Sequence, residues 1–261
     1  MANHFLEKLF GLSGQTAVVT GGTGVLGGSL CEGLAQAGAF VVVAGRNEQH
    51  GAERVAAIEK LGGQAAFLSV DMVSRESVAR LLQETLKLRG QVDILVNGAG
   101  VNAASTYFDA KDEDWQRVLD TNLTSTHFGC QIFGKQMAES GRGGAILNIG
   151  SVTSDKPLSR VIAYSASKAA VVNLTQNVGR ELAPFNVRVN AICPGFFPAE
   201  QNRKILTEDR VRNIMAGTPM NRFGEPEELI GCALLLVSRA AGSFITGAAY
   251  YVDGGFTASR F

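Results

Sequence analysis

Residues 16–28 read TAVVTGGTGVLGG, a β-branched run that passes through a glycine-rich turn into an apolar helical pattern. The first five residues are typical of a buried strand. Gly22, Gly24 and Gly27 satisfy G-x-G-x-x-G between the strand and the helix. Glycine permits the tight turn and lets backbone N–H groups approach a pyrophosphate at the helix start. The stretch predicts a dinucleotide-binding unit, although a tight glycine turn without a ligand would show the same pattern.

Strand patterns alternate with helical patterns of ten or more residues along the rest of the chain. Several strand candidates are apolar almost throughout, as expected of strands that are covered on both faces. This alternation predicts a single α/β domain, doubly wound, with a mostly parallel seven-stranded sheet and helices on both faces. The predicted strands are residues 16–20, 40–44, 65–70, 92–97, 145–149, 187–192 and 248–252, and the predicted helices include residues 26–37, 48–61, 75–88, 113–139 and 161–183.

The composition narrows the class of protein. The 261 residues suffice for one large domain, and 24 basic groups balance 24 acidic ones, so we expect no nucleic-acid partner. The N-terminus, MANHFLEKLFGLSGQ, has neither a secretory core nor a membrane span, and the four cysteines form no C-x-x-C pair. These features predict a cytoplasmic protein with free thiols and no membrane partner. The three histidines are scattered, and we expect no metal site.

Arg46 stands just after the second predicted strand, and no acidic residue stands there. An acid at this position usually holds the ribose hydroxyls of NAD, whereas an arginine accommodates the 2′-phosphate of NADP. We therefore expect a preference for NADP, with NAD possible; a solvated arginine at a helix start is the alternative. Asp71, after the third strand, is placed to bind adenine or to cap the next helix, a role for which Ser74 competes.

Tyr164 and Lys168 stand four residues apart in a predicted helix, and Ser151 precedes the tyrosine by thirteen residues. The spacing places both side chains on one helical face. An ammonium so close is expected to lower the pKa of the phenol and so suit it as a general acid. The same spacing also occurs by chance on exposed helices. Asn122, a polar residue inside the helix 113–139, is expected to have a function, such as binding water at a bend.

Together these stretches resemble the short-chain dehydrogenase/reductase family over nearly the whole chain. The resemblance implies a Rossmann-type domain, a nicotinamide cofactor, hydride transfer at a carbonyl carbon and a homotetramer. It implies Tyr164 as acid/base, Ser151 orienting the substrate oxygen, Lys168 holding the ribose and Asn122 holding a relay water. The expected cofactor-binding residues are Gly21, Gly22, Thr23, Gly24, Val25, Leu26, Gly27, Arg46, Asp71, Met72, Asn97, Gly98, Ala99, Gly100, Tyr164, Lys168, Pro194, Gly195 and Phe197.

The chain departs from the family pattern at three positions. Val25 stands where the family's glycine turn has another glycine, so the turn is expected to follow a slightly different path. Gly98 replaces an asparagine and supplies no side-chain amide. Ala199 replaces a threonine, so one hydroxyl contact to the cofactor is missing.

The last third of the chain is similar to enzymes described as mannonate (fructuronate) or gluconate oxidoreductases. Residues 196–216 are expected to form a lid within a catalytic and substrate half of about 151–261, which follows a cofactor half of about 14–150. The lid brings Glu200 and Arg203, and Arg160 lies one helical turn before Tyr164. A guanidinium would hold the carboxylate of a keto sugar acid, whereas salt bridges within the lid or between subunits are the alternative.

The predicted function is NADP-preferring oxidation and reduction of a small polyhydroxy substrate, with a keto sugar acid as the expected class. A 3-oxoacyl thioester reductase is an alternative. It would need a hydrophobic or pantetheine-sized groove, and also a basic patch if the acyl group arrives on an acidic carrier protein. A non-catalytic NADP-binding sensor or scaffold on the same fold is another.

Overall fold

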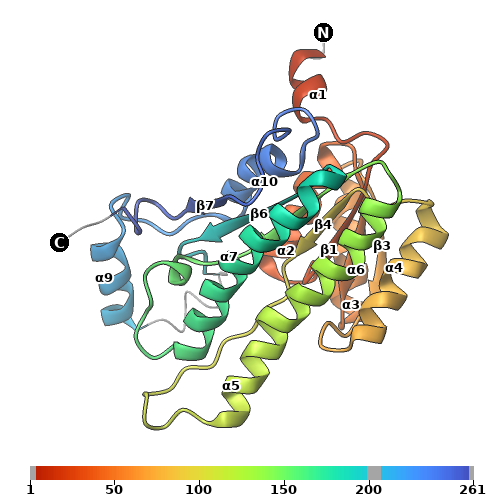
Figure 1. Ribbon diagram of the computed structural model, residues 1–261. Helices are drawn as coiled ribbons and strands as arrows, with labels where there is room; N and C mark the ends of the chain where they lie inside the picture. The colour runs from red at the N-terminus through yellow and green to blue at the C-terminus, as the bar shows by residue number, and fades with distance from the viewer. Residues whose placement is uncertain (1–3, 199–206, 259–261) are drawn as a thin grey trace.

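The computed structural model describes residues 4–198 and 207–258. Its centre is a seven-stranded sheet in the order β3-β2-β1-β4-β5-β6-β7, in which all neighbouring strands run parallel (Figure 1). The order reverses direction between β1 and β4, which opens a crevice at the carboxyl ends of these two strands. The strands are β1 Thr16–Thr20, β2 Phe40–Gly45, β3 Gln64–Ser69, β4 Ile94–Asn97, β5 Gly144–Ile149, β6 Val187–Pro194 and β7 Ala249–Val252.

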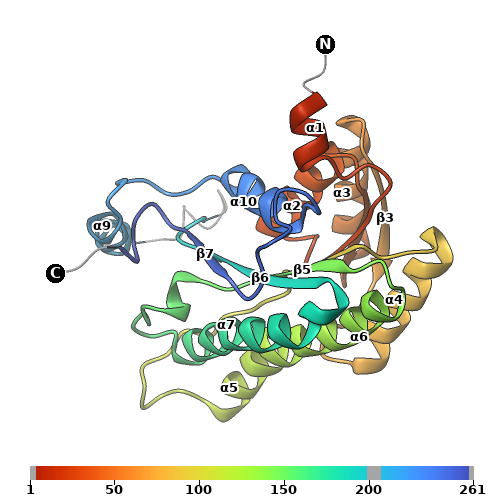
Figure 2. The same ribbon diagram turned by 45° about the horizontal axis from the view of Figure 1, so that its top comes forward.

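Helices cover both faces of the sheet. Figure 2 shows α2, α3 and α10 on one face and α4, α6 and α7 on the other, with α5 outside α6 and α7. The helices are α1 His4–Phe10, α2 Val25–Gln36, α3 Glu48–Lys60, α4 Arg75–Arg89, α5 Asp112–Leu119, α6 Ser125–Glu139, α7 Ile162–Leu182, α9 Glu208–Gly217 and α10 Ile230–Val237, with short turns η1 Asp120–Thr124, η2 Val152–Ser154, η3 Ala183–Phe185 and η4 Pro226–Leu229.

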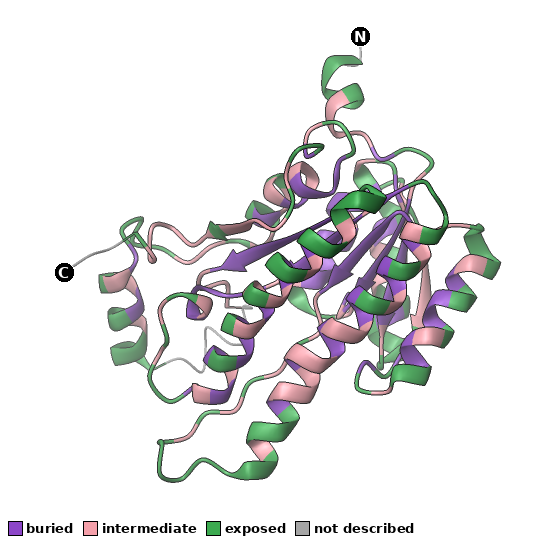
Figure 3. Ribbon diagram, viewed as in Figure 1, coloured by how far each residue is buried: buried purple, intermediate pink, exposed green. Residues whose placement is uncertain are grey.

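Alternate residues of each strand enter two separate cores. Val19 and Val43 pack with residues of α2 and α10, whereas Val18 and Val42 pack with residues of α4 and α6, and all four are fully buried. Strands must therefore be apolar on both sides, which explains their continuous apolar runs. Figure 3 shows the buried strands enclosed by helices whose outer faces are exposed.

The predicted doubly wound α/β fold is confirmed, and the sheet is wholly rather than mostly parallel. One predicted helix is not continuous. Residues 113–139 form α5 and α6, which are joined by the π-helical turn η1 around Asn122. No helix in the described part of the chain is both long and apolar enough to cross a bilayer.

Candidate active site

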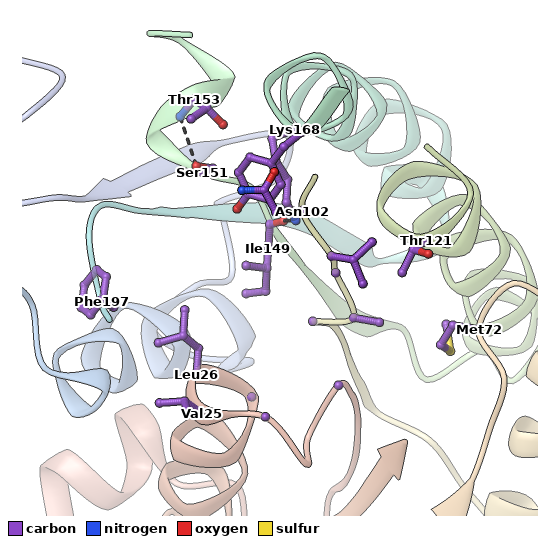
Figure 4. Close-up of a pocket in the computed structure, with 18 of the residues that line it drawn as sticks. Val25, Leu26, Met72, Asn102, Thr121, Ile149, Ser151, Thr153, Lys168 and Phe197 are labelled. Atoms are coloured by element: carbon purple, nitrogen blue, oxygen red, sulfur yellow. Dashed lines mark hydrogen bonds between the residues drawn. The ribbon is translucent and has the colours of Figure 1, made fainter. Parts of the chain in front are cut away.

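A large pocket in the described residues opens at the carboxyl ends of the strands. Its volume is about 1250 Å³, beyond the several hundred Å³ of a typical small-ligand pocket. Figure 4 shows the side chains that surround it. Val25 and Leu26 come from the start of α2, Ser151 and Thr153 follow β5, and Lys168 comes from α7. Segments far apart in the sequence thus meet at the edge of the sheet where the sequence predicted ligand binding.

The glycine turn between β1 and α2 forms one wall of this pocket. Gly21 has a left-handed φ of +70°, and a Cβ on Gly27 would lie 2.3 Å from the carbonyl oxygen of Gly21, so both positions require glycine. Gly24 is the N-cap of α2 and supplies no side-chain hydrogen bond to the first turn. The first N–H groups of α2 thus have no side-chain cap and are available to an anion. The turn fits the pyrophosphate of a dinucleotide, despite Val25.

Two side chains at the ends of the neighbouring strands line the same pocket. Arg46 follows β2, next to Gly45. Asp71 follows β3, and its Oδ1 accepts a hydrogen bond from the Val73 N–H at 3.2 Å. Ser74, not Asp71, caps α4, because its Oγ accepts from the Ser77 N–H at 3.2 Å. Of the two roles that the sequence left open for Asp71, capping α4 is therefore excluded.

Ser151, Tyr164 and Lys168 lie together at the other end of the pocket. A side-chain hydrogen bond joins Ser151 and Tyr164. The Ser151 Oγ also accepts from the Thr153 N–H at 3.1 Å, which holds the serine in place. Lys168 is buried, and its Nζ donates to the Ile149 carbonyl at 2.7 Å and lies 5.6 Å from the centre of the Tyr164 ring.

The prediction that Lys168 lowers the pKa of Tyr164 is wrong for this structure. Burial raises the pKa of Tyr164, and only its hydrogen bond with Ser151 works in the opposite direction. Burial also lowers the pKa of Lys168 to about 8, so the buried ammonium is itself disfavoured. The Lys168 amine points to the Ile149 carbonyl instead of forming a hydrogen bond to the phenol.

Asn122 lies in the π-helical turn and is fully buried beside this group. Its Nδ2 donates to the Val101 carbonyl at 2.9 Å and to the Ser167 Oγ at 3.0 Å. Its Oδ1 accepts from the Val101 N–H at 2.8 Å. Both amide hydrogens are therefore used by the protein. The relay water stays a prediction. The Asn122 side-chain amide has no free hydrogen to donate to such a water.

Besides Asn122, four predicted site residues in the described ranges do not line the pocket, namely Gly22, Asn97, Arg160 and Pro194. A Cβ on Gly22 would lie 2.9 Å from the Cys31 Sγ, and Asn97 is buried, with its Nδ2 donating to the Asn148 Oδ1 at 2.9 Å. Pro194 is the buried last residue of β6. Arg160 has a left-handed φ of +69° and does not line the pocket.

Glu200, Arg203 and Ala199 lie outside the described residues, so the structure does not test the predictions made for them. The rest of the predicted lid begins with Phe196 and Phe197, which line the pocket, and ends with α9. The remaining predicted cofactor-binding residues all line the pocket, from Gly21 to Gly195.

Sequence reasoning missed several polar residues of the lining. Asn102 comes just after the second glycine turn, residues 97–100, and this position could have suggested that it lines the pocket. Thr153 is buried, and its hydroxyl has no hydrogen-bond partner among the described residues. Arg117 and Arg210 come from α5 and α9, and no local pattern distinguishes them from other exposed arginines. Within the described ranges, no cluster of three or more His, Cys, Asp or Glu could hold a metal ion.

Comparison with known proteins supports a single family. A family model described as "Enoyl-(Acyl carrier protein) reductase" matches residues 24–257. A curated relative, the "Uncharacterized oxidoreductase UxuB" of Bacillus subtilis, is 37% identical over 268 residues that cover 95% of this chain and 96% of that protein.

Two crystal structures share both fold and sequence with the chain. A short-chain type dehydrogenase/reductase from Mycobacterium marinum has a TM-score of 0.91 and 34% identity, and covers 97% of this chain and 99% of its own. A gluconate 5-dehydrogenase from Burkholderia cenocepacia, in complex with NADP and tartrate, has a TM-score of 0.92 and 31% identity, with 97% and 99% covered.

Proposed function

Since the chain belongs to the short-chain dehydrogenase/reductase family and is an oxidoreductase of CH–OH groups that uses a nicotinamide cofactor, we propose that it interconverts a keto sugar acid and the corresponding hydroxy acid, with NADP as the preferred cofactor. The observation that carries this proposal is one pocket in which an uncapped glycine turn faces the hydrogen-bonded pair Ser151 and Tyr164.

In the proposed reduction, Tyr164 donates the proton to the substrate carbonyl oxygen. Burial keeps the phenol protonated at neutral pH, because it raises the tyrosine's pKa. Ser151, already hydrogen-bonded to Tyr164, orients the same oxygen and stabilises the charge that develops on it. The bound nicotinamide supplies or accepts the hydride at the carbonyl carbon. Lys168 would hold the cofactor ribose from its buried position behind the tyrosine.

The polar lining at the catalytic end supports a substrate with several hydroxyl groups. Asn102 and Gln116 offer amides, and Thr153 offers a hydroxyl that has no partner among the described residues. A hydroxyl-rich substrate would satisfy such groups, whereas an apolar chain would leave them unpaired. The gluconate 5-dehydrogenase relative was crystallised with tartrate, a small hydroxy acid, and this similarity favours the same class of substrate.

Arg46 supports the preference for NADP. It lines the pocket at the end of β2, where a 2′-phosphate would extend from the adenine ribose, and its guanidinium would bind that phosphate. The residue before it is Gly45, and no carboxylate at this strand end competes for the ribose hydroxyls.

One panel of assays tests the proposed function. NADPH and NADH oxidation would be followed with D-fructuronate, 5-keto-D-gluconate, the neutral ketose D-fructose and an acetoacetyl thioester. We expect the highest kcat/KM with a keto sugar acid and NADPH. Turnover of the thioester alone would overturn the proposal and favour the second candidate, a 3-oxoacyl thioester reductase, to which the acyl-carrier description of the matching family model points.

We further propose that the protein is a cytoplasmic homotetramer. A groove between α6 and α7, with a volume of about 590 Å³, is lined by apolar groups that include Val178, Leu182 and the half-exposed Phe185. Such a surface supports association between copies of the chain. Light scattering after size-exclusion chromatography would give about four times the chain mass of 27.6 kDa for a tetramer, and the chain mass itself would contradict it.

A further inference from the structure

The cationic side chains that line the large pocket differ in whether they already have a partner in the protein. Four cationic side chains line it, namely Arg46, Arg117, Lys168 and Arg210. Arg46 stands at the end assigned to the cofactor, and the Lys168 Nζ donates to the Ile149 carbonyl. Arg117 pairs with Asp114 at 2.8 Å. Of the two remaining arginines of the lining, Arg210 alone has no ion pair to any residue that the structure describes.

The position of Arg210 on α9 explains why it reaches the pocket. Thr207 caps α9 by accepting from the Arg210 N–H at 3.3 Å, so Arg210 lies in the first turn. Ile214, four residues later on the same face, is the buried residue of this helix. Arg212 lies on a different face, where it pairs with Asp209 and does not line the pocket. The helix therefore presents one of these two arginines to the pocket and the other to solvent.

The acidic residues of the lining sit on other elements than Arg210. Asp71 follows β3, Glu113 belongs to α5 and Asp120 to η1, and Asp120 accepts from the Gln116 Nε2 at 2.8 Å. An anionic group at the catalytic end is repelled by Glu113 and Asp120 and attracted by Arg210. Figure 1 shows α9 on the same side of the molecule as the first turn of α7, which carries Tyr164.

We propose that Arg210 is a specificity-determining residue, which binds the carboxylate of the substrate while the Ser151–Tyr164 pair addresses its ketone. A guanidinium fork matches a carboxylate with two parallel hydrogen bonds and thereby also orients the substrate. This assignment rests on the proposed function, and it takes the place of the role expected for Arg160.

The test compares D-fructuronate with D-fructose, which carries a CH₂OH in place of the carboxylate. KM and kcat for each, and KM for NADPH, would be measured for wild type, R210Q, R210K, R117Q and R212Q. We expect R210Q to raise KM for D-fructuronate by at least about tenfold with little change in kcat, the signature of lost binding shared by ground and transition states. D-Fructose and NADPH should be affected less than twofold. R210K should recover part of the affinity, and R212Q, the matched control on the same helix, should equal wild type.

The outcomes separate the two proposals. If wild type reduces D-fructuronate and R210Q does so with unchanged KM, the assignment of Arg210 is overturned and the proposed function stands. The assignment is also overturned if R210Q harms D-fructuronate and D-fructose equally, if it raises KM for NADPH instead, or if R117Q rather than R210Q shows the loss. If wild type reduces no keto sugar acid, the proposed function fails and the Arg210 assignment with it.

Discussion

The Asn122 side chain forms two hydrogen bonds with the backbone of Val101. Its Oδ1 accepts from the Val101 N–H at 2.8 Å and its Nδ2 donates to the Val101 carbonyl at 2.9 Å. These two bonds hold the segment after the second glycine turn against the π-helical turn, close to Ser151 and Lys168. A third bond, from Nδ2 to the Ser167 Oγ at 3.0 Å, ties the same side chain to α7.

Asn122→Ala should therefore reduce stability and activity together. It leaves the half-buried N–H and carbonyl of Val101 without their partner, which costs about 1–3 kcal/mol per unsatisfied group. We expect the free energy of unfolding in urea to fall by about 2–4 kcal/mol and kcat to fall at least tenfold. Gln49→Ala, on the exposed face of α3 with a side-chain hydrogen bond to Glu53, is the control and should change stability by less than about 0.5 kcal/mol. Equal stabilities of the two variants would contradict this role of Asn122.

Two glycines in helices should respond in opposite ways to an added methyl group. In Gly27→Ala the new Cβ would lie 2.3 Å from the Gly21 carbonyl oxygen, so the phosphate-binding turn must shift. We expect loss of at least about 2 kcal/mol of stability and at least tenfold weaker NADPH binding. In Gly231→Ala, within α10, nothing lies within 4 Å of the new Cβ, and a gain of about 0.5–1 kcal/mol is expected. Thermal unfolding with and without NADPH measures both effects, and a stable G27A variant with normal affinity would show that the turn tolerates a side chain.

Arg46→Glu tests the cofactor preference. The substitution removes the proposed phosphate partner and adds a charge that repels the 2′-phosphate. We expect kcat/KM for NADPH to fall by about 100-fold or more, in line with the loss of a charge-assisted pair, while the value for NADH should rise, because an acid at this position can hold the ribose hydroxyls of NAD. Arg75→Gln, which removes an arginine that packs over Phe128 away from the pocket, is the control. A wild-type enzyme that prefers NADH, or equal losses with both cofactors, would contradict the role of Arg46.

Lys168→Met should separate stability from activity. Because burial lowers the pKa of Lys168 from 10.5 to about 8, the unfolded chain binds one more proton between these values. Lys168 therefore does not destabilise the wild type above pH 10.5. Its destabilising effect grows as the pH falls and is complete below about pH 8. We expect K168M to be inactive yet about 2 kcal/mol more stable than wild type at pH 7. The difference should fall by about 1.4 kcal/mol for each pH unit above about pH 8 and so be close to zero near pH 9.5.

Urea unfolding at pH 7 and pH 9.5 measures this difference, since other titrating groups cancel between the two proteins. Lys87→Met, at an exposed site on α4, is the control and should show no such dependence on pH. A K168M variant that is less stable than wild type at both pH values would refute the destabilising effect of the buried ammonium.

Much of this architecture was predictable because it depends on local patterns. Buried parallel strands need continuous apolar runs, and the turn after β1 needs glycine at Gly21 and Gly27, so both features are visible in the sequence. The spacing of Tyr164 and Lys168 also placed them correctly in α7 and in one pocket. Their mutual effect on pKa was not predictable, because burial and the Ile149 carbonyl outweigh the proximity of the two residues in sequence.

The substrate end of the pocket shows where local patterns fail. Arg160 has the expected helical spacing to Tyr164, but it precedes the first residue of α7 and has left-handed backbone, so helical geometry does not apply. Arg210 and Arg117 reach the pocket only through the packing of α9 and α5, which no short-range pattern encodes.

In the proposed reaction Tyr164 delivers the proton, and Tyr164→Phe removes the group that does so. The variant keeps the ring and its packing but removes the hydroxyl that is hydrogen-bonded to Ser151. Steady-state NADPH oxidation with the best keto sugar acid, together with NADPH binding measured by fluorescence, gives both readouts. We predict that kcat falls by about 10³-fold or more while the Kd for NADPH changes less than twofold. A variant that retains more than a tenth of the wild-type kcat would exclude Tyr164 as the proton donor.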